Sequence, residues 1–332
     1  MKLSIILPVY GVEKYIEDCI QSCIENIGVQ SDDVEVLVVD DGSKDQSIEI
    51  AKGLTQDYTY FRFISQKNQG LSMARNNGME AAKGDYVWFV DPDDIIAKGI
   101  VNSILNVITH YEQVDMIELQ YQLVDEDVNR ASLQPACFQV DKRSDLSGQM
   151  KLLSGFSSPV PFHVFRRAFL IEKGLRMYPG IYHEDGEFTP RALWMASKVV
   201  TLNGTAYYYR QRRNSIMSTV NPKKGEDNMF VAHRLMDFFD KQVMTVGERR
   251  IVNNFISMAF CNGLHSAVGA IGDEDRRRID VAAYEHRKVL SCLKESIQMK
   301  YRVLGFLGSI FPKKTVDIYL LMMRFNKKAL KK

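Results

Sequence analysis

The sequence predicts an α/β protein in which a mainly parallel sheet is flanked by helices and followed by a helical C-terminal region. Up to about residue 125, short apolar segments typical of strands alternate with amphipathic segments typical of helices. This alternation indicates βαβ units, which build parallel sheets. Beyond Pro222 the apolar residues recur every three or four positions, so helices are expected there.

The composition is that of an ordinary soluble globular protein. Of the 332 residues, 45% are hydrophobic and 25% are charged, and the net charge is +2. Five cysteines without a C-x-x-C motif indicate neither a disulfide framework nor a zinc site, which favours a reducing compartment. No apolar run approaches the roughly 18 to 20 residues of a spanning helix. We therefore expect a cytoplasmic protein without a nucleic-acid partner, in which any membrane contact is peripheral and at the inner face.

The first half of the chain contains the clearer pattern. Strands are expected at 4–10, 34–39, 60–65 and 86–90, and helices at 12–28, 44–56, 71–83 and 97–111. Aromatic and β-branched residues dominate the strands, and the helices have apolar residues at helical spacing. Ser43 with Gln46 three residues later matches a capping box at the start of the second helix.

The second half gives weaker signals and suggests a boundary near residue 220. Strands are expected at 115–124, 137–140, 199–202 and 206–210, and helices at 143–154, 180–196, 229–244, 246–271 and 280–299, with a charged connector at 272–278. The pattern predicts a first domain at 1–220 and a helical region with a basic tail at 221–332.

Acidic residues follow two of the predicted strands directly. They are Asp40 and Asp41 after the strand at 34–39, and Asp91, Asp93 and Asp94 after the strand at 86–90. Strands of one parallel sheet end on the same side, so both groups are expected to line one crevice. Mg²⁺ and Mn²⁺ typically take one or two carboxylates together with phosphate oxygens, so a D-x-D turn suits a metal that carries a diphosphate. The alternative is that these acids cap a helix, and this stays open for Asp94.

Five motifs carry a resemblance to a known family. They are ILPVYG, VVDDGSKD, NQGLSMARNNGMEAAKGDY, FVDPDD and HEDGEF, in this order. In order and spacing they resemble the family 2 inverting glycosyltransferases, whose GT-A fold is a Rossmann-like, mainly parallel sheet that binds a nucleotide-sugar. The resemblance is strong over 1–125, weaker over 162–218 and absent beyond. It implies that 1–220 is a catalytic domain with a nucleotide-binding half at 1–125 and an acceptor half at 126–220.

The resemblance also assigns residues to the donor and to the metal. Pro8 and Tyr10 match positions that line the base and ribose, and Asp41 matches the residue that accepts the uracil imide N–H. Arg75 matches a residue near the base and phosphates. Asp91 matches the acid near the ribose and metal, and Asp93 matches the direct metal ligand. The implied cofactor is Mn²⁺ or Mg²⁺, and the implied donor is a nucleotide-sugar, usually a UDP-sugar.

Asp185 matches the general base of the family. Inversion at a sugar carbon needs one base to take the acceptor hydroxyl proton, while a metal neutralises the leaving diphosphate. The alternative is that Glu184 and Asp185 only complement a helix dipole. Arg210 and Arg213 lie where some relatives carry a histidine ligand, and they either contact the diphosphate or belong to a solvated basic loop. His183 lies beside the base, where a structural hydrogen-bonding role is the more common one.

The basic tail at 301–332 gives the only indication of the acceptor. Lysines and arginines alternate there with large apolar residues, which suits an anionic membrane surface. We therefore expect a glycan or a lipid-linked acceptor in surface polysaccharide synthesis. The Q-x-x-R-W signature of processive synthases is missing, which favours a nonprocessive enzyme that adds one sugar. The alternative is that the tail packs on the protein or pairs subunits.

Two other functions remain open. A catalytically inactive nucleotide-sugar-binding protein is disfavoured by the joint presence of the expected base and metal ligands. Another metal-dependent nucleotide enzyme is disfavoured by two sequence features. A nucleotidyltransferase normally has a Gly-rich basic loop after its first strand, where this chain has YGVEKY. A haloacid-type phosphatase needs D-x-D-x-T, and Ile95 stands two residues after Asp93.

Overall fold

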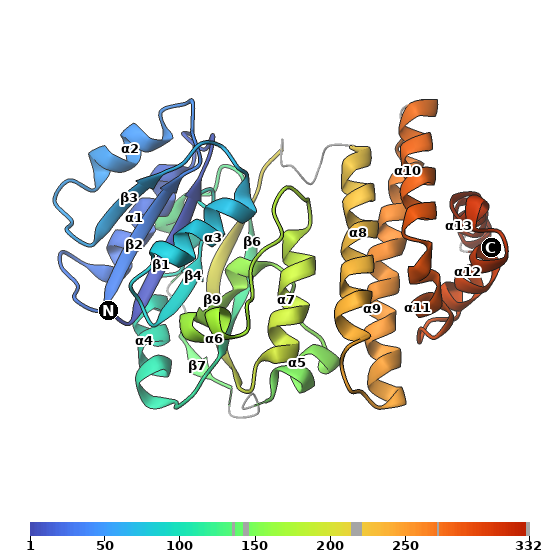
Figure 1. Cartoon of the computed structure of the whole chain (residues 1–332). Helices are drawn as coiled ribbons and strands as arrows, with labels where there is room; N and C mark the ends of the chain where they lie inside the picture. Colours follow the sequence, from blue (N-terminus) through green and yellow to red (C-terminus); the bar gives the residue numbers. More distant parts are fainter. Residues whose placement is uncertain (135–136, 142–145, 214–220, 271, 330–332) are drawn as a thin grey trace. The chain divides into compact units, whose positions relative to one another are not determined.

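The computed structural model describes residues 1–134, 137–141, 146–213, 221–270 and 272–329 (Figure 1). These residues form two compact units. The first comprises Met1–Gly180 and Phe188–Ser215, and the second comprises Ile181–Glu187 and Ile216–Lys332. No helix in the described ranges is both long enough and apolar enough to cross a membrane.

The first unit is built on one sheet, which has nine strands within the described residues. They are β1 (Leu3–Val9), β2 (Val34–Asp40), β3 (Phe61–Ser65), β4 (Tyr86–Phe89), β5 (Ile95–Ile96), β6 (Met116–Asp125), β7 (Gln139–Val140), β8 (His163–Arg166) and β9 (Val199–Gln211). Their order is β3-β2-β1-β4-β8-β6-β9-β5, with β7 paired to β9. Strands β1 to β4 are mutually parallel, and β8 runs antiparallel to β4 and β6. The predicted α/β class, with a mostly parallel sheet and a helical C-terminal region, is confirmed.

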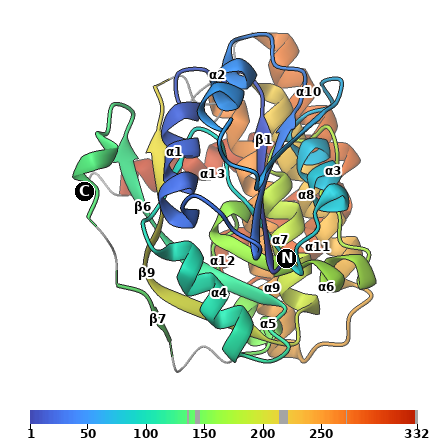
Figure 2. The same ribbon diagram turned by 90° about the vertical axis from the view of Figure 1, so that its left-hand side faces the viewer.

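Helices cover both faces of the parallel half of the sheet. They are α1 (Ile16–Ile27), α2 (Ser47–Leu54), α3 (Leu71–Ala81) and α4 (Ile100–His110). All residues of β1 are buried, as expected for a strand with helices on both sides. Figure 2 shows α1 and α3 on opposite sides of β1. Gly78 lets α3 approach closely, because an added Cβ would lie 2.5 Å from Cγ2 of Ile6.

Three further helices belong wholly or partly to the first unit. They are α5 (Gly148–Ser154), α6 (Arg167–Glu172) and α7 (Glu184–Met195). The first turn of α7 lies in the segment that belongs to the second unit. There the buried carboxylate of Glu187 accepts a hydrogen bond from Nε of Arg234 at 2.9 Å.

The second unit is otherwise helical. It contains α8 (Pro222–Phe239), α9 (Val246–His265), α10 (Asp273–Glu285), α11 (Leu290–Lys294), α12 (Met299–Ile310) and α13 (Thr315–Ala329). Helices α8 and α9 pack closely at Gly263, where a Cβ would lie 2.7 Å from the carbonyl oxygen of Gly225. The side chains beyond Arg324 lie outside the described ones.

Several predicted boundaries are wrong, and local contacts explain why. Helix α2 begins at Ser47 without a capping box, because Asp45 accepts the N–H and O–H of Ser47 at 3.2 and 2.7 Å. The two strands expected at 199–210 form one strand, β9, with an irregularity opposite β6. The expected connector at 272–278 lies mostly in α10. Residues 143–145 of the expected helix at 143–154 lie outside the described ranges.

Candidate active site

The acid at the end of β2 organises the loop that precedes α3. Asp41 is buried, and its carboxylate accepts the backbone N–H groups of Gln69 and Gly70 at 2.8 and 2.9 Å. It also accepts Nε2 of Gln66 at 2.8 Å, and the amide of Asn77 in α3 donates to the side-chain oxygen of Gln66 at 2.6 Å. All the donors to this carboxylate are therefore uncharged N–H groups.

The acids after β4 are also tied to α3. Arg75 of α3 is 1% exposed, and its Nη2 lies 2.7 Å from Oδ1 of Asp91. Strand β1 lies between β2 and β4 and runs parallel to both, so the two acidic strand ends share one edge of the sheet. The structure thus brings Asp41, Arg75 and Asp91 to this edge, with α3 in contact with both acidic segments.

Asp94 is buried, Asp93 has a side chain that is 14% exposed, and the two acids have different partners. Burial and the neighbouring Asp91 raise the pKa of Asp93, while Arg212, whose Nε lies 2.7 Å from Oδ2, opposes the shift. Burial, Asp93 and Asp91 raise the pKa of Asp94 well above its usual range. The carboxylate of Asp94 accepts the hydroxyl of Tyr207 at 2.7 Å and the N–H of Arg210 at 2.8 Å.

The proposed capping role of these acids is wrong. The next helix, α4, begins at Ile100, and its N-cap residue is Gly99, which makes no side-chain capping bond. Asp94 instead ties the acidic turn to β9 through Tyr207 and Arg210. The acids therefore lie on a turn between β4 and β5. Capping of a helix does not explain their presence.

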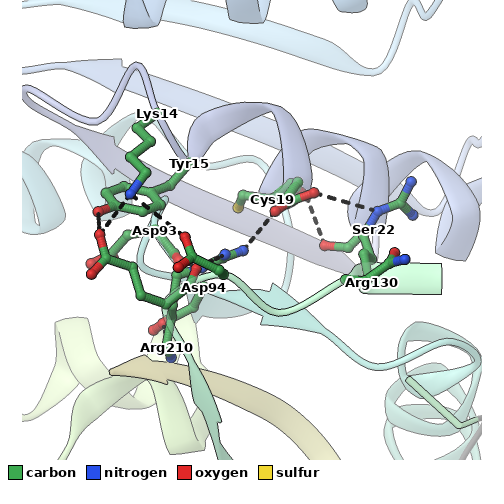
Figure 3. A network of polar contacts seen from close by, with 12 residues as sticks. Lys14, Tyr15, Cys19, Ser22, Asp93, Asp94, Arg130 and Arg210 are labelled. Carbon is green, nitrogen blue, oxygen red and sulfur yellow. Dashed lines mark hydrogen bonds and ion pairs between the residues drawn. The ribbon is translucent and has the colours of Figure 1, made fainter. Parts of the chain in front are cut away.

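Arg210 lies inside the network drawn in Figure 3. Its guanidinium donates to the carbonyl oxygens of Asp93 and Glu126 at 2.9 and 2.7 Å and to the carboxylate of Asp18 at 2.7 Å. The side chain is almost fully buried. This geometry differs from the expected contact with a diphosphate, because the guanidinium is directed at protein acceptors and joins β9 to α1 and the acidic turn.

Glu126 holds the residues that follow β9 through hydrogen bonds to its carboxylate. Its carboxylate accepts Nζ of Lys14 and the hydroxyl of Tyr15, both at 2.7 Å, and the N–H of Arg213 at 3.1 Å. The hydrogen bonds from Lys14 and Tyr15 lower the pKa of Glu126 to about 2. Arg213 itself is exposed.

Arg212 is the site residue that the sequence analysis did not assign. It pairs with Asp93, and its guanidinium lies 5.4 Å from the centre of the Tyr15 ring. The available signal was its spacing. Residues two apart on extended backbone lie on the same face, so Arg212, which directly follows β9, was a candidate for the same side as Arg210.

The two expected base-lining residues at the end of β1 differ in exposure. Pro8 is buried within β1, in register with Val39 of β2. Tyr10 follows the strand and is 50% exposed, so its ring is open to a planar ligand. Tyr10 is therefore accessible to a ligand, whereas Pro8 is part of the buried strand that precedes it.

Asp185 lies in the first turn of α7, in the segment that belongs to the second unit. It is partly buried, and the helix N-terminus favours an ionised carboxylate. His183 precedes this turn with a positive φ of 63°, and its Nε2 has no hydrogen-bond partner within the described part of the chain. Burial lowers the pKa of His183, so the neutral ring is favoured.

The chemistry of the donor set fits a hard divalent cation. Within the described ranges no group of three or more His, Cys, Asp or Glu side chains is arranged to hold a metal. Asp91 and Asp93 nevertheless offer two carboxylates, and Mg²⁺ or Mn²⁺ commonly completes its shell with phosphate oxygens and water. The raised pKa of Asp93 shows that its negative charge is incompletely neutralised by the protein.

The fold is shared with two solved structures. The crystal structure of S. aureus TarS in complex with UDP-GlcNAc superposes with a TM-score of 0.77 and 20% identity, covering 98% of this chain and 92% of that one. A mannosyltransferase from Pyrobaculum calidifontis, in complex with GDP-Man and Mn²⁺, superposes with a TM-score of 0.56 and 11% identity. Its match covers 98% of this chain and 88% of that one.

Sequence comparison identifies the family. Residues 4–171, just over half of the chain, match the profile of "Glycosyl transferase family 2", and the protein belongs to this family. The uncharacterized glycosyltransferase EpsJ of Bacillus subtilis is 30% identical over 220 residues. That match covers 64% of this chain and 62% of EpsJ, so it spans less than two thirds of the relative.

Proposed function

We propose that the protein is a metal-dependent, inverting, nonprocessive glycosyltransferase. It moves one sugar from a nucleotide-sugar, most simply a UDP-sugar, to a hydroxyl of a glycan or lipid-linked acceptor in surface polysaccharide synthesis. The observation that carries the proposal is the arrangement of acids around α3. Asp41 holds the loop that leads into this helix, and Asp91 pairs with Arg75 on it.

The base and ribose belong at the β1 and β2 ends. Tyr10 offers an exposed ring for stacking. Asp41 has two oxygens with about four lone-pair sites, and three are used by the loop. The remaining site can accept one N–H from a base such as uracil. The UDP and UDP-GlcNAc complexes of TarS support a uridine donor.

The diphosphate belongs at the β4 end. Asp91 and Asp93 would hold Mn²⁺ or Mg²⁺, and the bound metal would neutralise charge on the leaving diphosphate. Cation binding at Asp93 would free Arg212 for a phosphate oxygen, and Arg213 lies next to it in the chain. We assign Arg210 a positioning role, because it contacts Asp93, Glu126 and Asp18.

Asp185 is the proposed general base. One carboxylate is enough, because it only has to take the proton of the acceptor hydroxyl as the sugar carbon inverts. Its place in the first turn of α7 suits a carboxylate, since the partial positive charge of a helix N-terminus stabilises negative charge there.

The proposal is tested by separating donor binding from transfer. Calorimetry should show that UDP binds more tightly with Mn²⁺ than without it. Asp185→Asn should keep this binding and lose transfer by roughly 100-fold or more, the contribution typical of a general base. Glu184→Gln, at the adjacent position of the same turn, is the matched control and should retain most activity. Full transfer by Asp185→Asn would remove the base assignment, and absence of UDP binding would remove the donor assignment.

A further inference from the structure

Helix α12 has an outward-facing apolar stripe. We define the α12 face as four large apolar residues at helical spacing with the residue that follows the helix. They are Met299, Val303, Phe306, Ile310 and Phe311, and they are between 40% and 64% exposed. Spacings of four, three and four place the four helical residues on one side of the helix. Single exposed apolar residues are common, but a contiguous set indicates an interaction surface.

The packing of the opposite side fixes the orientation of α12. Tyr301, Leu304, Gly305 and Gly308 are buried there. The helix approaches α11 closely at Gly305, where an added Cβ would lie 2.7 Å from the backbone nitrogen of Lys294. The inner side is therefore filled, and the helix cannot turn its apolar stripe inward. Figure 1 shows α12 and α13 at the end of the helical unit that lies away from α8.

The charged residues of the stretch 296–316, which contains the α12 face, have one sign. Residues 296–316 contain four cations and no acid, and all four cations are exposed. They are Lys300, Arg302, Lys313 and Lys314. An acid adjoins each end of the stretch. Glu295 accepts a hydrogen bond from Asn253 at 3.2 Å, and Asp317 is bound by Arg276 at 2.6 Å and by Lys314 at 3.3 Å. The surface of this stretch is therefore apolar and positively charged.

We propose that the α12 face docks on an anionic lipid surface. Apolar side chains on one face of a helix enter the boundary between headgroups and acyl chains, while flanking cations contact acidic headgroups. A second copy of the chain is a poor occupant, because an isologous contact would place the same cations against each other. The docking stands on these residues alone. Its purpose, access to a lipid-linked acceptor, rests on the proposed function.

The test measures binding of the full chain to vesicles. We expect flotation with vesicles containing about one third phosphatidylglycerol, and at least tenfold weaker binding to pure phosphatidylcholine. The double variant Phe306→Ser/Ile310→Ser should bind the anionic vesicles at least tenfold more weakly. Arg302→Gln/Lys313→Gln should also weaken binding, and its residual binding should depend less on salt. Val246→Ser, which removes a 76% exposed apolar residue from α9, is the control and should bind like the parent.

The outcomes separate the partners. Equal flotation of Phe306→Ser/Ile310→Ser and the parent would overturn the proposal. The proposal would also be overturned if the parent did not bind vesicles and instead formed dimers that the double variant disrupts. Binding of the parent to an acidic protein but not to vesicles would overturn it as well. UDP binding, measured on the same variants, should stay unchanged. If neither the parent nor any variant bound UDP, the result would count against the proposed function and would leave the docking result intact.

Discussion

Two acids of the first unit, the buried Glu35 and the partly buried Asp93, have opposite electrostatic surroundings. Glu35 lies near the start of β2 and accepts Oγ of Ser4 and the N–H of Lys83, both at 2.6 Å, and the guanidinium of Arg62. Burial acts to raise the pKa of Glu35, but these three donors outweigh it and the pKa is lowered. For Asp93, burial and Asp91 prevail over Arg212, and the pKa is raised.

The difference separates a structural acid from an acid that is a candidate for binding a ligand. The protein supplies enough donors to stabilise the charge of Glu35. The charge of Asp93 is left partly uncompensated, beside Asp91, at the edge of the sheet where ligands bind in α/β folds. Strongly perturbed acids in such places are candidates for function. The comparison predicts that removing the charge of Asp93 weakens donor binding with little change in stability. Removing the charge of Glu35 should lower stability with little change in donor binding.

Asp93→Asn should have the largest effect on donor binding. We expect the affinity for UDP in the presence of Mn²⁺ to fall about 100-fold, the upper range for disturbance of a metal site. The free energy of unfolding should change by less than about 1 kcal/mol, because relief of repulsion with Asp91 offsets the lost pair with Arg212. Titration calorimetry with and without Mn²⁺ checks this. An unchanged affinity with Mn²⁺ would remove Asp93 from the metal site.

Glu35→Gln should have the converse effect. Loss of the carboxylate leaves Arg62 without its buried partner, which typically costs about 3 kcal/mol of unfolding free energy. Affinity for UDP with Mn²⁺ should stay within about twofold of the parent, since Glu35 lies at the far end of β2 from Asp41. Urea unfolding and calorimetry measure the two quantities. Glu49→Gln, an exposed acid on α2, is the control and should change neither.

The sequence was sufficient for the features that are encoded locally. Apolar runs such as that at 86–90 predicted the parallel strands, because a strand with helices on both faces has no polar side. The acids that follow β2 and β4 were found for the same reason, since a strand end is visible as a change of polarity. The helix of small residues at 71–83 was also predicted, and α3 was observed at Leu71–Ala81.

The misassigned residues depend on partners far away in the chain. Asp94 bonds to Tyr207 over a separation of 113 residues, and Arg210 bonds to Asp18 over 192. No local pattern records such contacts, so neither the buried role of Asp94 nor the inward direction of Arg210 could be derived. Glu35 could have been noticed, because an acid within the apolar run VEVLVV of a buried strand requires a partner.

The pH dependence of stability should follow the sign of the shift at Glu35. Its pKa is lower in the folded chain than the ordinary value of 4.5, so the folded state favours the charged form. The stability that it contributes is complete above pH 4.5 and is lost as the pH falls through the folded pKa. The stability difference between the parent and Glu35→Gln should therefore shrink below pH 4.5, by at most about 1.4 kcal/mol per pH unit. Urea unfolding from pH 3 to 7 checks this, and a difference that grows in acid would contradict it.

The smallest expected effect concerns backbone strain near Asp185. His183 and Gln113 are the two non-glycine residues with positive φ among those described, at 63° and 56°. Replacing either with glycine should stabilise the fold by about 1 kcal/mol, because glycine adopts this conformation without strain. Thermal unfolding measures the gain.

The two glycine variants differ in what they reveal about function. Gln113 is exposed in the turn after α4, so Gln113→Gly should leave transfer unchanged. His183 carries a ring nitrogen without a hydrogen-bond partner among the described residues, two residues before Asp185. If His183→Gly gains stability but loses transfer tenfold or more, the His183 ring or its strained backbone contributes to the site. If transfer is unchanged, the positive φ of His183 beside the predicted base is not a sign of function.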